Sequence, residues 1–207
     1  MNALEKSAET YTVRDSNIEI CFRYATDRWC HRVSTNRNGR WYPLLESEEG
    51  RADDQDLPSP ALQDLRFEEV RDRVFEFQLL GQAGKEIFSA AIRFDGTART
   101  IDFDLCARSR AMKVPACTHS QYVLAGGVEC PTVDRQPSSL SVQPDGESGL
   151  IIAALAIADG PIGECRLFDS SSVQRIGVGC FGGSGLETTR RGVSIRWRYQ
   201  MTLAGNP

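Results

Sequence analysis

The sequence VSIRWRYQMTL, residues 193–203, alternates apolar and polar side chains with a period of two. Successive side chains of a β-strand point to opposite faces, so one face of this segment is apolar and the other is polar. The apolar face carries Val193, Ile195, Trp197, Tyr199, Met201 and Leu203, and the polar face carries Ser194, Arg196, Arg198, Gln200 and Thr202. The pattern predicts a strand with one face in the core and the other in water.

The same period recurs over much of the chain. Residues 74–108 contain three alternating runs separated by the turn-rich sequences GQAGK and DGT, which predicts a three-stranded antiparallel meander. An alternating run at 18–24, and an Asn38-Gly39 turn followed by an apolar run, predict further strands near the N-terminus. Later candidate strands are 120–125, 140–143, 150–158, 163–168 and 173–179. The run 150–158 is apolar on both faces, so we expect it to be buried on both.

Ten or more short strands in 207 residues predict one all-β domain covering residues 1–207. We expect a single-domain antiparallel β-sandwich. A closed β-barrel is the alternative, because both architectures produce the same alternation.

Three segments depart from the strand pattern. In SPALQDL, Ser59 can cap a helix and Pro60 can take its first position, which predicts one short helix near 60–65. The acidic, apolar-poor segment 46–60 predicts an exposed loop, and the glycines that follow residue 176 predict a Gly-rich loop over 177–192.

The composition limits the expected partners. The net charge is −4 with both signs interspersed, so the chain has no basic stripe to contact phosphates, and we expect no nucleic-acid partner. The longest apolar run is half the length of a membrane span, and the first residues lack the apolar core of a secretory signal. We therefore expect no membrane partner and a cytoplasmic location. Seven cysteines without a CxxC pair predict reduced thiols.

The chain contains two histidines, and each lies near a cysteine. His31 follows Cys30 directly, so in a strand their side chains diverge, which argues against a reactive pair. His119 lies two residues after Cys117, and the two could share one face of a strand. A structural zinc site usually needs four ligands with close cysteine pairs, so we expect no metal. His31 and His119 remain candidate general bases.

Asp102 and Asp104 share the outward face of their predicted strand. Paired carboxylates can act as acid and base in glycoside cleavage, so both are candidate catalytic residues, although a solvated face is the common reason for such a pattern. The sequence GVGCFG at 177–182 matches the glycine spacing of a dinucleotide-binding loop. No apolar helix follows it, so we expect no cofactor.

Arginine and aromatic residues alternate in RWRY and GRWY. Arg196 and Arg198 lie on the outward face of their strand, while Trp41 and Tyr42 follow a turn that should leave one of them exposed. These four residues are candidate ligand contacts, since arginine and aromatic side chains suit stacking on a planar ligand.

The first functional hypothesis is non-catalytic binding of a small polar ligand, such as a carbohydrate. The alternative is a carbohydrate-active enzyme, of an epimerase, mutarotase or hydrolase type, that uses a histidine base and a carboxylate. A third hypothesis is a subunit that self-associates through an exposed sheet edge or face.

Overall fold

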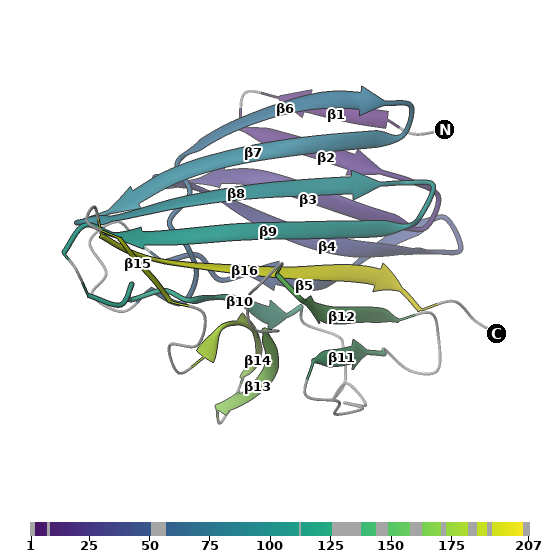
Figure 1. The fold of residues 1–207 in the computed structure, drawn as a ribbon. Helices are drawn as coiled ribbons and strands as arrows, with labels where there is room; N and C mark the ends of the chain where they lie inside the picture. Colours follow the sequence, from purple (N-terminus) through teal and green to yellow (C-terminus); the bar gives the residue numbers. More distant parts are fainter. Residues whose placement is uncertain are drawn as a thin grey trace.

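The computed structural model of the protein describes residues 3–7, 9–50, 57–111, 113–125, 138–143, 149–157, 163–170, 173–181, 186–189 and 192–204. These residues form sixteen strands in two antiparallel sheets, with no helix among them (Figure 1). A helix that is long and apolar enough to cross a membrane is absent from this part of the chain.

Sheet A contains, in spatial order, β1 (Ala3–Ser7), β2 (Thr10–Arg14), β3 (Ile18–Ala25), β4 (Arg28–Arg37), β5 (Arg40–Ser47), β10 (His119–Leu124), β14 (Val173–Gly179) and β13 (Glu164–Ser170). Sheet B contains β11 (Ser139–Val142), β12 (Leu150–Leu155), β16 (Gly192–Leu203), β9 (Thr100–Ser109), β8 (Glu86–Asp95), β7 (Val74–Ala83) and β6 (Asp64–Arg71), with β15 (Glu187–Thr189) paired to β16. Strands β6–β9 lie in front of β1–β4 in Figure 1. The predicted sandwich and the predicted meander of 74–108 are confirmed. The sheets are not joined at their edges, so the closed alternative is excluded.

The core lies between the inner faces of the two sheets. The two faces of β16 are oriented as the sequence predicts, since Trp197 and Tyr199 are fully buried and Arg196 is exposed. The largest buried side chains also include Tyr122, Phe22, Phe77, Phe88, Phe94 and Phe103. The Asn38-Gly39 turn is confirmed as well, because both residues have positive φ angles, 51° and 81°, as a two-residue hairpin turn requires.

The helix predicted near 60–65 is wrong. Residues 60–63 form no regular secondary structure, and residues 64 and 65 already belong to β6. The backbone N–H of Gln63 donates to the carbonyl of Leu80, a bond to a neighbouring strand that a helix would replace by bonds within the segment. The segment can lie this close to β7 because residue 81 is a glycine. A Cβ at this position would lie 1.7 Å from the carbonyl oxygen of Ala61. Tertiary pairing therefore outweighs the local capping signal.

The segment 46–60, predicted to be an exposed loop, is described only at its two ends. The Glu49 side chain is 3% exposed, and Leu57 is buried. The hydroxyl of Ser59 caps no helix; it accepts a hydrogen bond from the backbone N–H of Gln121 at 2.8 Å. Both described ends therefore pack against sheet A, which an acidic composition alone does not reveal.

Strand β12 differs from the prediction for residues 150–158. Leu150 and Ile152 are buried, but Ile151 between them is 37% exposed. The strand therefore has one outer face, although its sequence is apolar on both.

The predicted Gly-rich loop over 177–192 contains more strand than expected. Strand β14 continues to Gly179, β15 occupies 187–189, and β16 begins at Gly192. Residues 182–185 and 190–191 of this loop lie outside the described part of the chain.

Candidate functional site

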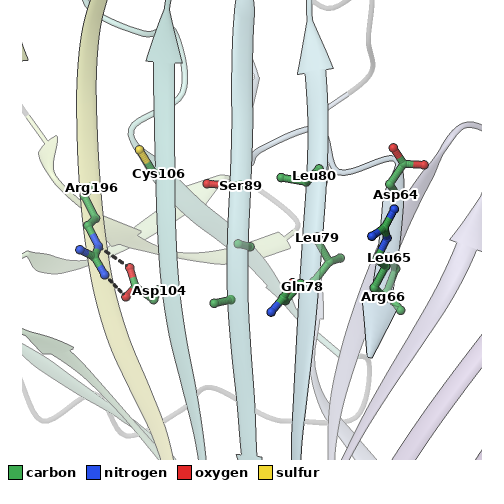
Figure 2. Close-up of a pocket in the computed structure, with 12 residues that line it drawn as sticks. Asp64, Leu65, Arg66, Gln78, Leu79, Leu80, Ser89, Asp104, Cys106 and Arg196 are labelled. Atoms are coloured by element: carbon green, nitrogen blue, oxygen red, sulfur yellow. Dashed lines mark hydrogen bonds and ion pairs between the residues drawn. The ribbon is translucent and has the colours of Figure 1, made fainter. Parts of the chain in front are cut away.

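A shallow pocket of about 690 Å³ lies on the outer face of sheet B, where strands β6, β7, β8, β9 and β16 meet (Figure 2). The antiparallel register arranges its outward residues in two rows that run across the strands. The first row is Asp64, Leu80, Ser89, Cys106 and Arg196, and the second is Arg66, Gln78, Ala91 and Asp104. These side chains point outward because their neighbours along each strand, such as Phe77 and Phe103, fill the core.

An ion pair forms one end of the pocket. Arg196 donates two hydrogen bonds to the Asp104 carboxylate, one from Nε to Oδ1 at 2.6 Å and one from Nη2 to Oδ2. These hydrogen bonds raise the pKa of the Arg196 guanidinium. The Nε of Arg198 lies 3.5 Å from the same carboxylate. The Arg196 side chain is 54% exposed, so the paired groups remain accessible to a ligand.

The other polar side chains of the pocket have no partner among the residues that the structure describes. Within the described part of the chain, no hydrogen bond or ion pair is recorded for the side chains of Asp64, Arg66, Gln78 and Ser89. By contrast, Asp102 lies in the next row, outside the pocket, and accepts a hydrogen bond from Gln200 Nε2 at 2.7 Å. The structure therefore brings predicted residues Asp104, Arg196 and Arg198 together and leaves Asp102 beside them.

His31 lies between the sheets, on the inner face of β4. Its Nε2 is 2.9 Å from the hydroxyl of Tyr122, which is 2.5 Å from the hydroxyl of Tyr199. Its Nδ1 is 3.4 Å from Oε1 of Glu49. We call these four buried side chains the His31 network.

The His31 network is closed to ligands. The cavity beside it has a volume of about 10 Å³, which is about the space of one water molecule. Burial raises the pKa of Tyr122 and of Tyr199, because the phenolate forms would lose their hydration. His31 links the two sheets through Tyr122 and Tyr199, and the cavity between the sheets beside it is too small for a substrate.

His119 lies on the opposite face of sheet A from His31. Along β10 it alternates with the buried residue Ser120, and its ring centre is 4.9 Å from that of Phe181. Burial lowers the pKa of His119. Cys117 precedes the strand and is fully buried, with its thiol 3.1 Å from the His119 carbonyl oxygen. The two side chains therefore do not form a chelating pair.

Cys30 and His31 point to opposite faces, as the strand alternation predicts. Cys30 and Cys21 line a small outer pocket of about 110 Å³, which His31 also borders, but the buried His31 ring points inward to Tyr122. Burial raises the pKa of Cys30 to about 11, which disfavours its thiolate at neutral pH. Within the described ranges, no group of three or more metal-binding side chains is found.

Trp41 and Tyr42 lie on β5 of sheet A, away from the pocket on sheet B. The guanidinium carbons of Arg37 and Arg40 are 5.3 and 5.5 Å from the centre of the Tyr42 ring, and that of Arg14 is 5.8 Å from Trp41. Both rings are therefore engaged by arginines of the protein itself. The four predicted ligand contacts divide between two separate places.

Sequence reasoning missed several pocket residues. Asp64 fell inside the predicted helix, and Arg66 just beyond it. Gln78 and Ser89 occupy outward positions of the predicted meander, so the alternation contained the signal that could have found them. No local signal pointed to Glu49, whose contact with His31 depends on the path of the chain after β5.

No protein-family model matches this chain, and no curated protein matches its sequence.

Proposed function

We propose that the protein is a non-catalytic β-sandwich that binds a small polar ligand of the carbohydrate class in the pocket on sheet B. One observation supports this most strongly: among the described residues, Asp64, Arg66, Gln78 and Ser89 have no side-chain partner, and they gather beside the accessible Asp104–Arg196 ion pair. The pocket volume of about 690 Å³ falls within the range of about 300–1,000 Å³ of small-molecule sites.

The lining favours an uncharged ligand with many hydroxyl groups. Two carboxylates and two guanidinium groups balance one another, so no single sign of charge dominates the pocket. Hydrogen-bonding groups lie beside the apolar side chains of Leu80, which is 56% exposed, and Ala91. A sugar presents hydroxyls at its rim and C–H groups on its faces, which matches this mixture.

The alternative, an enzyme with a histidine base and a carboxylate, has less support. His31 is enclosed in the core, and His119 lies on sheet A, whereas Asp102 and Asp104 are on the outer face of sheet B. Asp64 and Asp104 are three strands and one row apart, which is about 16 Å and exceeds the separation of about 6.5–9.5 Å used by inverting glycosidases.

Binding measurements with single variants test the proposal. We expect isothermal titration calorimetry against neutral sugars, preselected on a glycan array, to show binding that Arg196→Ala weakens at least about tenfold, the loss of one hydrogen bond to a charged group. Gln78→Ala should weaken it about two- to tenfold, the loss of one hydrogen bond between neutral groups. Arg166→Ala is the matched control, because this arginine pairs with Glu164 at the far edge of sheet A. Unchanged affinity in both pocket variants would place the ligand elsewhere and overturn the proposal.

We also propose a cytoplasmic location. It is supported by the thiols, since the six described cysteines are all free. Titration of the denatured protein, purified without oxidant, should detect seven thiols. A count of five or fewer would contradict the proposed reducing compartment.

A further inference from the structure

We propose that the ligand is a linear, uncharged chain of about four sugar units that lies across the strands of sheet B and contacts both ends of the pocket. This inference rests on the proposed function, and it specifies the length, direction and charge of the ligand.

The two rows of lining residues define the direction. The first row runs from β6 through β7, β8 and β9 to β16, and the second runs from β6 to β9, both across the strands, as Figure 2 shows. Asp64 and Arg66, which have no side-chain partner among the described residues, lie at the β6 end, and the Asp104–Arg196 pair lies at the other. Four strand spacings of about 4.8 Å separate β6 from β16, a span of about 19 Å that accommodates about four sugar units.

The side chains that form the floor of the pocket between these two ends are short. Ser89 and Ala91 occupy the central strand β8 and have small side chains, and Cys106 continues the floor on β9. A chain crossing the strands therefore meets little obstruction in the middle. The exposed side chain of Leu80 offers a surface for the C–H face of a sugar ring.

The rows that flank the pocket along the strands carry longer side chains than Ser89 and Ala91 of its floor. On one side the next row contains Glu76 and Arg93, which form an ion pair at 3.4 Å, followed by Asp102 hydrogen-bonded to Gln200. On the other side the next row contains Gln82, Ile87 and Arg108. Because both sides are bounded by larger side chains, a long ligand fits across the strands rather than along them.

The charges at the two ends favour an uncharged chain. Among the lining residues, each end carries one carboxylate and one guanidinium, on Asp64 and Arg66 at one side and on Asp104 and Arg196 at the other, with Arg198 adjoining the Asp104 carboxylate at 3.5 Å. An acidic sugar would gain from each arginine but would be repelled by the neighbouring aspartate. Hydroxyl groups can donate to the carboxylates and accept from the guanidinium groups without this conflict.

A chain-length series tests the inference. The probes are neutral β-1,4-glucan, α-1,4-glucan, β-1,4-xylan and β-1,4-mannan oligosaccharides of one, two, four and six units, measured by calorimetry. For the series that binds, we expect affinity to rise at least about tenfold from two to four units and then to level off. Arg66→Ala should remove this gain. Arg71→Ala, on the same edge strand but paired with Asp95 outside the pocket, should preserve it.

The possible outcomes separate the two proposals. Equal affinity for one, two and four units, or a gain that Arg66→Ala does not reduce, would overturn the chain inference and leave the binding pocket intact. Tighter binding of oligogalacturonate than of neutral chains would overturn the assignment of an uncharged ligand. Failure of all four series to bind would overturn the carbohydrate assignment and the chain inference together.

Discussion

Replacement of Tyr122 by phenylalanine isolates the energetic role of the His31 network. The Tyr122 hydroxyl is fully buried and contacts both His31 Nε2 and the Tyr199 hydroxyl. Phenylalanine keeps the ring and removes only the oxygen, so packing is little changed. Tyr199 retains an interaction with Ser120, whereas His31 Nε2 loses the only hydrogen bond recorded for it in the described structure.

The expected cost follows from these contacts. A buried polar group without a partner costs about 1–3 kcal/mol, and the second lost hydrogen bond adds about 1 kcal/mol. We therefore expect Tyr122→Phe to reduce the free energy of unfolding by about 2–4 kcal/mol. For a chain of this length, each kcal/mol lowers the melting temperature by about 2–4 °C.

Urea denaturation followed by tryptophan fluorescence measures this change. The midpoint should fall while the slope of the transition stays constant, because the surface exposed on unfolding is the same. Tyr42→Phe is the matched control, since Tyr42 is 37% exposed and should shift the free energy by less than about 0.5 kcal/mol. A loss below about 0.5 kcal/mol for Tyr122→Phe would refute the hydrogen-bonded His31 network.

Three further predictions concern other parts of the sandwich. Trp197→Ala should cost about 3–5 kcal/mol in a thermal melt, because the indole is 1% exposed; a shift within error would reverse the face assignment of β16. Gly81→Ala should cost about 1–3 kcal/mol, because its Cβ would collide with the Ala61 carbonyl, and wild-type stability would contradict the path of this segment. Burial lowers the pKa of His119 in the folded protein below the ordinary value of 6.5, so stability should be full above pH 6.5 and decline as the pH falls below it. His119→Gln should reduce this decline between pH 7 and pH 5, and an unchanged pH profile of urea midpoints would count against the burial of the imidazole.

The sequence by itself determined which residues form most strands and which face of each strand is buried. Alternation is a local property, since the backbone of any strand sends successive side chains to opposite sides. It therefore identified Trp197 and Tyr199 as core residues and Arg196 as an outward residue before any partner strand was known. It also assigned opposite faces to Cys30 and His31.

Only the tertiary structure decided which strands are neighbours, and the candidate site depends on that choice. Arg196 reaches Asp104 because β16 inserts between β9 and β12, and 92 residues of chain separate the two side chains. Asp64 joins the pocket because its segment pairs with β7 as a strand, against a local helix signal. Glu49 likewise contacts His31 only because of the path that the chain takes after β5. These contacts arise from pairing and packing between distant segments, whose free energy is not encoded in the periodicity of any one stretch.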